Sequence, residues 1–245
     1  ADAIVTVGSD VRKIPTGQGG WALQLANTTN GKVKYTGNTA APWMRNLEEY
    51  TVVIHWTPST ADEGVEAYIL TAGTPSYGTG DMQLYKDASD KIIYWLGGNV
   101  ITGSSTIKCD GETPTSIILT YKKDAAKNNN RVKVYIDGVL QGKSSTTQTI
   151  TAAGPLILGG FFVSSSEDRG TTGYMEELVI YDKAYEVVPN SGPYVYNTVN
   201  LEDYDDPDTI QHSAKLIAAD YHNFRGTSKL EIGMSQSVQW GATIV

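Results

Sequence analysis

The sequence predicts an all-β protein built from antiparallel strands, and three observations support that prediction. First, Arg131–Ile136 alternates between polar and aliphatic residues, so its three aliphatic side chains share one face of an extended segment. Second, Asp137-Gly138 follows directly, and this dipeptide is among the strongest short signals for a hairpin turn. Third, the chain has 15 Tyr, 5 Trp and 25 Gly but few apolar repeats of helical period.

Further strands are predicted where β-branched and aromatic runs lie between clusters of Gly, Ser and Thr. In chain order they are Ala3–Val7, Trp21–Ala26, Lys32–Tyr35, Thr51–Pro58, Val65–Thr71, Asp81–Tyr85, Lys91–Leu96 and Ser116–Tyr121, with more strands up to Tyr181. Asn30-Gly31 predicts a hairpin that joins Trp21–Ala26 to Lys32–Tyr35. The first strand, Ala3–Val7, could pair with the C-terminal part of the chain.

The segment Thr115–Lys183 resembles the laminin G-like domains of the concanavalin A-like lectin/glucanase superfamily. Its motifs are VYIDGVLQG from Val134, PLILGG from Pro155 and GYMEELVIYDKAY from Gly173, and GWALQL from Gly20 is similar to an early strand of that family. The resemblance implies a two-layer antiparallel β-sandwich, a jelly roll of the concanavalin A-like type. It does not decide function, because this superfamily includes lectins, glycanases and adhesion modules.

The composition changes after this segment and suggests three parts. We expect a laminin G-like sandwich over residues 1–186, an acidic connector over 187–209, and C-terminal strands over 210–245. The connector contains a Pro/Gly/Asn/Ser cluster and five acidic residues between Asn200 and Asp208, which is typical of an irregular crossing segment. The passage DYHNFRGTS from Asp220 resembles tails that follow laminin G-like domains in some phage and virus structural proteins. Two isolated strands are unstable, so we expect residues 210–245 to dock on the sandwich or on a neighbouring subunit.

Charge and cysteine content exclude several classes of protein. The formal net charge is −8, which argues against nucleic acid or an anionic membrane surface as the main partner. No apolar run approaches the roughly 20 residues of a membrane span, so no membrane insertion is expected. Cys109 is the single cysteine, which excludes an internal disulfide and favours a small buried residue. The absence of a starting Met indicates a processed chain or a piece of a longer one.

The sequence contains no recognisable catalytic motif. Glycanases of this superfamily carry an E-x-D-x-x-E pattern that places two carboxylates on one strand face about 5 Å apart, and the pattern is absent here. Glu176 and Glu177 are adjacent, so we expect them on opposite sides of their strand. G-x-S-x-G, H-E-x-x-H and phosphate-binding glycine loops are also missing. We therefore expect a protein that is not an enzyme.

Two kinds of binding site are predicted. The resemblance implies Ca²⁺ on rim loops, and Asp81, Glu167 and Asp168 match by position. Carboxylate and carbonyl oxygens are the ligands that Ca²⁺ prefers. Aromatic platforms for a glycan or a partner protein are predicted at Trp43, Tyr77, Trp95, Phe161 and Phe162, although aromatic side chains also build cores.

These observations favour a non-enzymatic interaction module within a larger extracellular or virion assembly, such as a capsid or tail decoration or an adhesion protein. Its partners would be other protein subunits. Two alternatives stay open. The first is a carbohydrate-binding lectin, with or without Ca²⁺, and the second is a glycanase. Saturable glycan binding would distinguish the lectin from an assembly protein, and release of reducing sugar would identify the glycanase.

Overall fold

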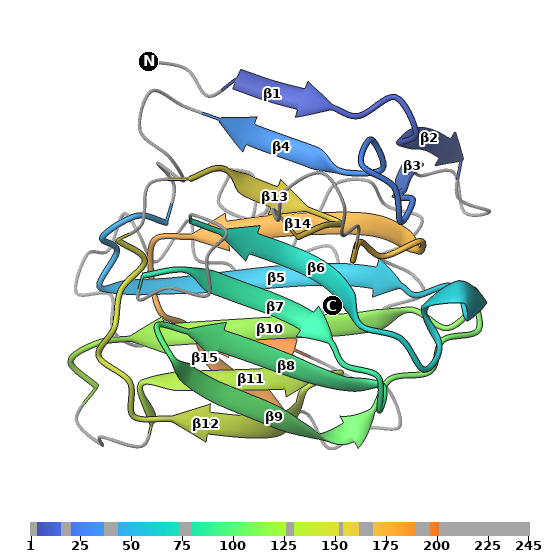
Figure 1. Cartoon of the computed structure of the whole chain (residues 1–245). Coiled ribbons are helices and arrows are strands. Elements are labelled where there is room, and N and C mark those ends of the chain that lie inside the picture. The colour runs from blue at the N-terminus through green and yellow to red at the C-terminus, as the bar shows by residue number, and fades with distance from the viewer. Residues whose placement is uncertain are drawn as a thin grey trace, which may run out of the picture.

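The computed structural model describes residues 4–15, 21–36, 44–73, 80–125, 130–151, 154–161, 169–189 and 197–200. These residues form two antiparallel sheets packed face to face, which confirms the all-β, concanavalin A-like sandwich (Figure 1). The front sheet, which faces the viewer in Figure 1, contains in order β1 (Ile4–Val7), β4 (Val33–Thr36), β13 (Leu156–Leu158), β6 (Ala67–Ala72), β7 (Met82–Lys86), β8 (Lys91–Leu96) and β9 (Asn99–Thr106).

The second layer, the back sheet, lies behind the front sheet. It contains in order β12 (Val139–Ser144), β11 (Val132–Ile136), β10 (Thr115–Lys122), β5 (Glu49–Thr57), β14 (Tyr174–Tyr181), β3 (Trp21–Gln24) and β2 (Arg12–Pro15). A 3-10 turn, η1 (Thr60–Asp62), follows β5, and β15 (Glu186–Pro189) pairs with β16 (Asn197–Asn200) in a separate ribbon. Most of the predicted strands are therefore confirmed, whereas β2 and β9 were not predicted.

The core lies between the two sheets and is filled by alternate residues of each strand. In β5, the inward side chains Tyr50, Val52, Ile54 and Trp56 are almost completely buried. The neighbouring strand β10 contributes its own alternate set, with Ile117 opposite Ile54. Burial of such side chains stabilises the fold by about 1.5–3 kcal/mol each. This period of two is the pattern from which the strands were predicted.

The hairpin between β11 and β12 has the conformation that its sequence predicts. Asp137 and Gly138 have φ angles of 49° and 75°, which are the left-handed values required by a two-residue turn of the primed type. The Asp137 carboxylate also accepts a hydrogen bond of 2.8 Å from the backbone N–H of Ser116. The turn is thus tied to the start of β10.

The sandwich is closed along the margin where β9 faces β12. The side-chain oxygen of Gln141 accepts hydrogen bonds from the Ser104 hydroxyl at 3.1 Å and from the Ser105 N–H at 2.8 Å. A Cβ atom at Gly142 would lie 2.5 Å from a methyl carbon of Ile101, so a glycine is needed for the sheets to approach this closely. Toward the opposite margin, where the back sheet ends in β3 and β2, β14 pairs with β3 only at Tyr174 and Met175.

One predicted pairing was wrong. β4 does not form a hairpin with β3, because the chain leaves the back sheet after Gln24 and enters the front sheet at Val33. The tight turn at Asn30-Gly31 exists, and the Ala26 N–H donates to the Gly31 carbonyl at 3.2 Å, but it carries the chain from one layer to the other. β1 pairs with β4 on one side, from Ile4 opposite Thr36, and the C-terminal segment that it could also pair with lies outside the described residues.

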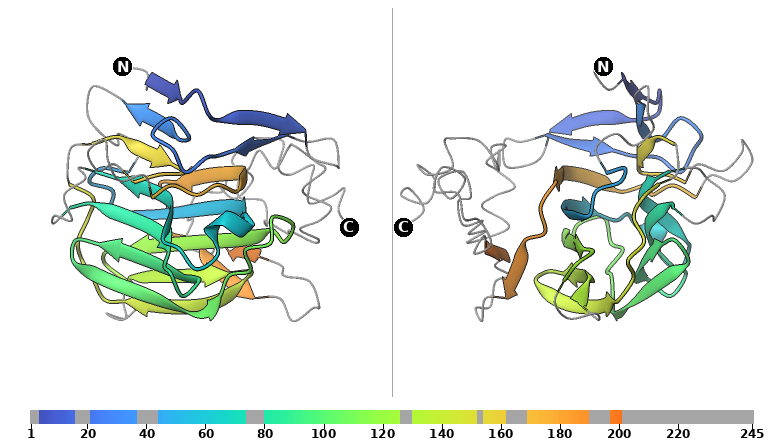
Figure 2. Two further views of the ribbon diagram at one scale, coloured as in Figure 1. Left: turned by 45° about the vertical axis from the view of Figure 1, so that its right-hand side comes forward. Right: turned by 90° about the vertical axis from the view of Figure 1, so that its left-hand side faces the viewer.

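The ribbon formed by β15 and β16 lies on the side of the back sheet (Figure 2). Val187 of β15 is buried and packs against Val53, Ile118 and Tyr135 on the outer surface of that sheet. Within the connector predicted over 187–209, the described residues 187–189 and 197–200 are extended, and an apolar patch on the back sheet gives β15 a surface to cover. The predicted C-terminal strands over 210–245 lie outside the described residues.

Candidate functional site

The outer surface of the front sheet carries a row of side chains that cross five strands. The pairing register places Ile157, Thr71, Gln83, Trp95 and Val100 side by side, each on the strand next to the previous one. Their inward neighbours, such as Leu84 and Tyr94, belong to the core, so the row faces away from it. Ile157, Thr71 and Gln83 are buried, Trp95 is half-buried, and Val100 is exposed. We call this row, together with Tyr68 and Tyr85, the front face.

Aromatic rings cover the next part of the front face. The rings of Tyr68 and Tyr85 lie 4.7 Å apart and are nearly parallel, at 23°. The ring of Phe161 lies 4.4 Å from that of Tyr68 and is tilted by 32°. Phe161 is only 2% exposed, whereas Tyr85 is half-buried and reaches solvent.

The amide of Gln83 is the unusual group on the front face. Its side chain is 3% exposed, and its Nε2 atom has no hydrogen-bond partner in the structure. A buried donor without a partner costs about 1–3 kcal/mol relative to a satisfied one. Nearby, the Thr71 hydroxyl donates to the Gly160 carbonyl at 3.1 Å and so does not satisfy the amide. Gln83 therefore offers an unused donor beside Trp95.

A buried carboxylate fixes the chain segment that borders the front face. Asp62, 1% exposed, accepts hydrogen bonds from the Thr171 hydroxyl at 2.7 Å and from the Thr172 N–H at 3.0 Å. The indole N–H of Trp56 donates to the same Thr171 hydroxyl at 3.0 Å. Just before this network, the carbonyl of Arg169 accepts a bond of 2.7 Å from the Tyr68 N–H. The aromatic part of the front face is thus attached to the core of the sandwich.

The structure places three of the eight predicted site residues. Trp95 lies on the front face, as a glycan platform would require, while Phe161 is buried in contact with the ring of Tyr68. Asp81 precedes β7 and is buried, with its carbonyl accepting a hydrogen bond from the Gly97 N–H at 3.3 Å. The other five, which are Trp43, Tyr77, Phe162, Glu167 and Asp168, lie outside the described residues.

Calcium binding stays a prediction. Within the described ranges, no three His, Cys, Asp or Glu side chains come together as a metal site would need. Asp81 alone supplies one carboxylate, whereas Ca²⁺ takes six to eight oxygens. An unchanged melting temperature after addition of EDTA would rule out a stabilising Ca²⁺ site.

Sequence reasoning missed Gln83 and Tyr85, the two polar side chains that β7 presents outward. The sequence of Met82–Lys86 contains a signal, because apolar Met82 and Leu84 alternate with Gln83 and Tyr85. In the structure, Gln83 and Tyr85 pair with residues of β8, the strand that carries Trp95. The partner of each residue across the sheet could not be read from the sequence without the hairpin registers. Cys109 is buried with its pKa raised to about 12 by burial, which fits the small buried residue expected there.

The back sheet carries a second polar row on its outer surface. Glu177, His55 and Ser116 lie side by side in register, and Nδ1 of His55 is 3.0 Å from a carboxylate oxygen of Glu177. His55 is 7% exposed and is therefore a packed residue of this surface. Next to Ser116, burial raises the pKa of Asp137, an effect that the Ser116 N–H and the nearby His55 partly offset.

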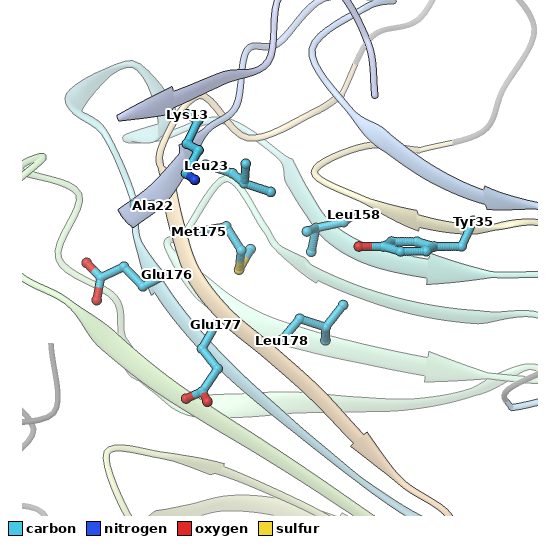
Figure 3. Close-up of a pocket in the computed structure, with 9 residues that line it drawn as sticks. All are labelled: Lys13, Ala22, Leu23, Tyr35, Leu158, Met175, Glu176, Glu177 and Leu178. Carbon is cyan, nitrogen blue, oxygen red and sulfur yellow. The ribbon is translucent and has the colours of Figure 1, made fainter. Parts of the chain in front are cut away.

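The expectation that Glu176 and Glu177 lie on opposite sides of the strand was wrong. A β-bulge between Met175 and Glu177 inserts Glu176 as an extra residue, so both carboxylates face outward. The Thr57 hydroxyl on the outer surface donates to Glu176 at 3.4 Å. Figure 3 shows both side chains pointing away from Leu158 and Tyr35.

A cleft of about 200 Å³ opens beside this bulge, between β3 and β14 (Figure 3). Its interior is apolar, and Lys13, Glu176 and Glu177 lie at its rim. The apolar lining consists of Ala22, Leu23, Leu158, Met175 and Leu178, together with the ring of Tyr35. Burial raises the pKa of the Tyr35 hydroxyl.

Two seven-stranded sheets and an aromatic outer surface define a lectin-like β-sandwich, and comparison with known families agrees. The chain belongs to the concanavalin A-like lectin/glucanases superfamily, whose laminin G-type family model matches residues 27–187. The resemblance seen in the motifs is thereby confirmed. A comparison with curated proteins gives no match.

Several solved structures share the fold at low sequence identity. The binding domain of botulinum neurotoxin serotype G has a TM-score of 0.54 and 16% identity over 75% of this chain, but only 44% of that domain is covered. The carbohydrate-binding module CBM40 of the Ruminococcus gnavus IT-sialidase, bound to α2,3-sialyllactose, has a TM-score of 0.51 and 16% identity over 75% of this chain and 94% of the module. A Trypanosoma rangeli sialidase has a TM-score of 0.51 and 14% identity, with 75% of this chain and 28% of that chain covered. Such likeness supports the fold alone.

In the described ranges, no helix is long and apolar enough to cross a membrane.

Proposed function

We propose that this protein is a non-catalytic carbohydrate-binding module and that its glycan binds on the front face. The observation that carries the proposal is the unused Gln83 donor beside the half-buried ring of Trp95. Sugars bind proteins through apolar contact with aromatic rings together with a few convergent polar groups. Trp95 and Tyr85 would supply the ring contacts, and Gln83 would donate to a sugar hydroxyl or carbonyl oxygen.

The comparison with CBM40 supports this proposal at the level of the fold, since that module was solved with sialyllactose bound. The absence of a glycanase motif, together with the separate partners of Glu176 and Glu177, supports a module that binds without cleaving. Glu177 contacts His55, and Glu176 contacts Thr57.

A glycan array followed by calorimetry tests the proposal. We expect saturable binding to at least one glycan class, and Trp95→Ala should lower the affinity at least tenfold, which corresponds to 1.4 kcal/mol. Gln83→Met keeps the shape of the side chain but removes the unpaired donor. It should lower affinity by a similar factor while raising the free energy of unfolding by about 1 kcal/mol.

Val139→Thr is the matched control, because Val139 is 59% exposed on the back sheet. It should leave glycan affinity unchanged. The proposal would be contradicted if no glycan on the array bound saturably, or if the Val139→Thr and Trp95→Ala variants bound the glycan with equal affinity.

We infer a second function, in an extracellular or virion assembly, from the C-terminal sequence. It is supported by Val187 of β15, which packs side chain to side chain on the outer surface of the back sheet, so this surface is covered by a strand that is not part of the sheet. Removal of residues 189–245 should then lower the oligomeric state in sedimentation. An unchanged oligomeric state would exclude docking through this segment.

A further inference from the structure

The free edge of β14 is the starting point for a second binding site. β14 pairs with β5 from Tyr174 to Tyr181, but with β3 only at Tyr174 and Met175. From Glu176 onward, no strand of the described chain pairs with the other edge of β14. In an antiparallel strand, alternate residues direct their N–H and C=O groups to each side. About half of the backbone groups of this stretch therefore point toward the opening.

The surface beneath this edge is apolar. Leu178 and Ile180 face inward and pack against the core, yet both are only half-buried. The cleft beside them continues to Leu158 and Tyr35 of the front sheet, which form its far wall (Figure 3). An added strand would place alternate side chains over these residues and extend the sheet at the same time.

The edge also lacks the usual protection against pairing. Exposed edges are blunted by Lys, Pro or short strands. β14 is eight residues long with the sequence YMEELVIY, which contains neither Lys nor Pro. Only the bulge at Glu176 interrupts it, at the end next to β3. At the opposite margin, Gln141 bonds β12 to β9 and no such opening exists.

The charged residues at the rim of the opening favour a ligand of positive charge. Glu176 and Glu177 both face outward there, against the single ammonium group of Lys13. Carboxylates near a docking edge favour a partner with a basic side chain at the matching position.

We propose that the β14 edge binds an extended peptide of another protein by strand addition. The peptide would carry aliphatic side chains at alternate positions, directed into the cleft, and a Lys or Arg near Glu176 and Glu177. Main-chain hydrogen bonds to β14 would supply affinity, and the cleft would supply specificity. This site is separate from the front face and does not depend on glycan binding.

The probe is a synthetic peptide with a fluorescent label, acetyl-Lys-Val-Thr-Leu-Thr-Val-Thr-amide, mixed with the full chain. Its aliphatic side chains share one face of the extended peptide, and its Lys lies on the other face. We expect saturable anisotropy and at least tenfold slower hydrogen exchange at those amides of Leu178–Tyr181 that point away from β5, with no change in β9. The same peptide with Pro in place of its central residues should not bind, because it cannot form the ladder.

Glu176→Lys should weaken binding of the probe about tenfold, while Glu112→Lys, an exposed carboxylate elsewhere, should not. If Glu176→Lys fails to fold, the exchange pattern of the unaltered protein still decides the question. Absence of saturable binding overturns the proposal, as does protection outside β14. A dimer that forms without peptide and protects Leu178–Tyr181 also overturns it, because the edge would then serve a second copy of this chain.

Discussion

The hydroxyl oxygens of Tyr50 and Tyr94 lie 2.7 Å apart at the centre of the sandwich. Tyr50 comes from β5 of the back sheet and Tyr94 from β8 of the front sheet, so this hydrogen bond connects the two layers. Both side chains are almost completely buried, and the ring of Tyr121 lies 5.0 Å from that of Tyr50. Among the described residues, each of these two hydroxyls therefore has the other as its hydrogen-bond partner.

The first prediction concerns this pair. Tyr94→Phe removes one partner and leaves the Tyr50 hydroxyl buried and unpaired, so it should destabilise the protein by about 1–3 kcal/mol. The double variant Tyr50→Phe with Tyr94→Phe removes both hydroxyls and should recover most of that loss. Urea unfolding of the four proteins in this cycle gives the coupling energy directly. Additive effects of the two substitutions would show that the hydroxyls do not interact.

A second prediction follows from the buried phenols at high pH. Burial raises the pKa of Tyr50 and Tyr94 above the ordinary value of 10.0, and it raises that of Tyr121 to about 12. The folded state therefore favours the neutral phenols more than the unfolded state does. The contribution of Tyr121 to stability is complete below pH 10 and is lost as the pH rises from about 10 to 12, while that of Tyr50 and Tyr94, whose pKa is raised further, continues to fall beyond this range.

The midpoint temperature of thermal unfolding, measured from pH 8 to 12, should fall steeply only above pH 10. Tyr121→Phe should make that fall shallower. A midpoint that stays level up to pH 12 would argue against the burial of these phenols.

The third prediction concerns Lys86, which is fully buried. Its ammonium group lies 2.6 Å from the Asp90 carboxylate and donates to the Val65 carbonyl at 2.7 Å. Burial would raise the pKa of Asp90, but hydrogen bonds from Lys86 and the Gly64 N–H outweigh it and the pKa is lowered. Asp90→Asn leaves a buried ammonium without its counter-ion and should cost about 2 kcal/mol at neutral pH.

This difference between Asp90→Asn and the unaltered protein depends on pH. Because the pKa of Asp90 is lower in the folded state, its stabilising effect is present above its ordinary value of 3.8 and is lost as the pH falls below it. The free energies of unfolding of the two proteins should therefore converge in acid. Asn retains the positive φ of 58° at this position, so the comparison reports the charge rather than the turn.

The fourth prediction concerns Gly173, at the start of the GYMEELVIY motif. A Cβ atom there would lie 2.2 Å from the backbone oxygen of Thr57, so Gly173→Ala must displace a strand of the core. We expect a loss of about 3 kcal/mol or more in the free energy of unfolding. Gly160→Ala is the matched control, because its Cβ would meet only the flexible side chain of Lys32, at 2.8 Å. Equal melting temperatures of the two variants would contradict this reading.

The sequence predicted those parts of the fold that depend on local signals. The strand β10 and the Asp137-Gly138 turn could be predicted because alternation and turn chemistry are properties of neighbouring residues. The position of β4 could not, since a loop of a few residues can either reverse a strand or carry it to the other layer, and Asn30-Gly31 is compatible with both.

The candidate site was less predictable for a similar physical reason. Trp95 was identified from its residue type, but the importance of Gln83 depends on which strand lies beside it and on whether its amide finds a partner. The two faces of β14 were also assigned wrongly, because strict alternation places Met175 and Leu178 on opposite sides. Both contribute to the core, and only an inserted residue between them makes that possible.

That inserted residue has a consequence for how the protein can vary. Because Glu176 is surplus to the pairing of β14 with β5, loss of its single codon would leave every later side chain on its present side of the sheet. A negative charge can therefore be gained or lost at position 176 without changing which side of the sheet the later residues of β14 face. A gene carrying the deletion should still yield a folded sandwich, which makes this position a natural place for evolution to adjust what the surface attracts.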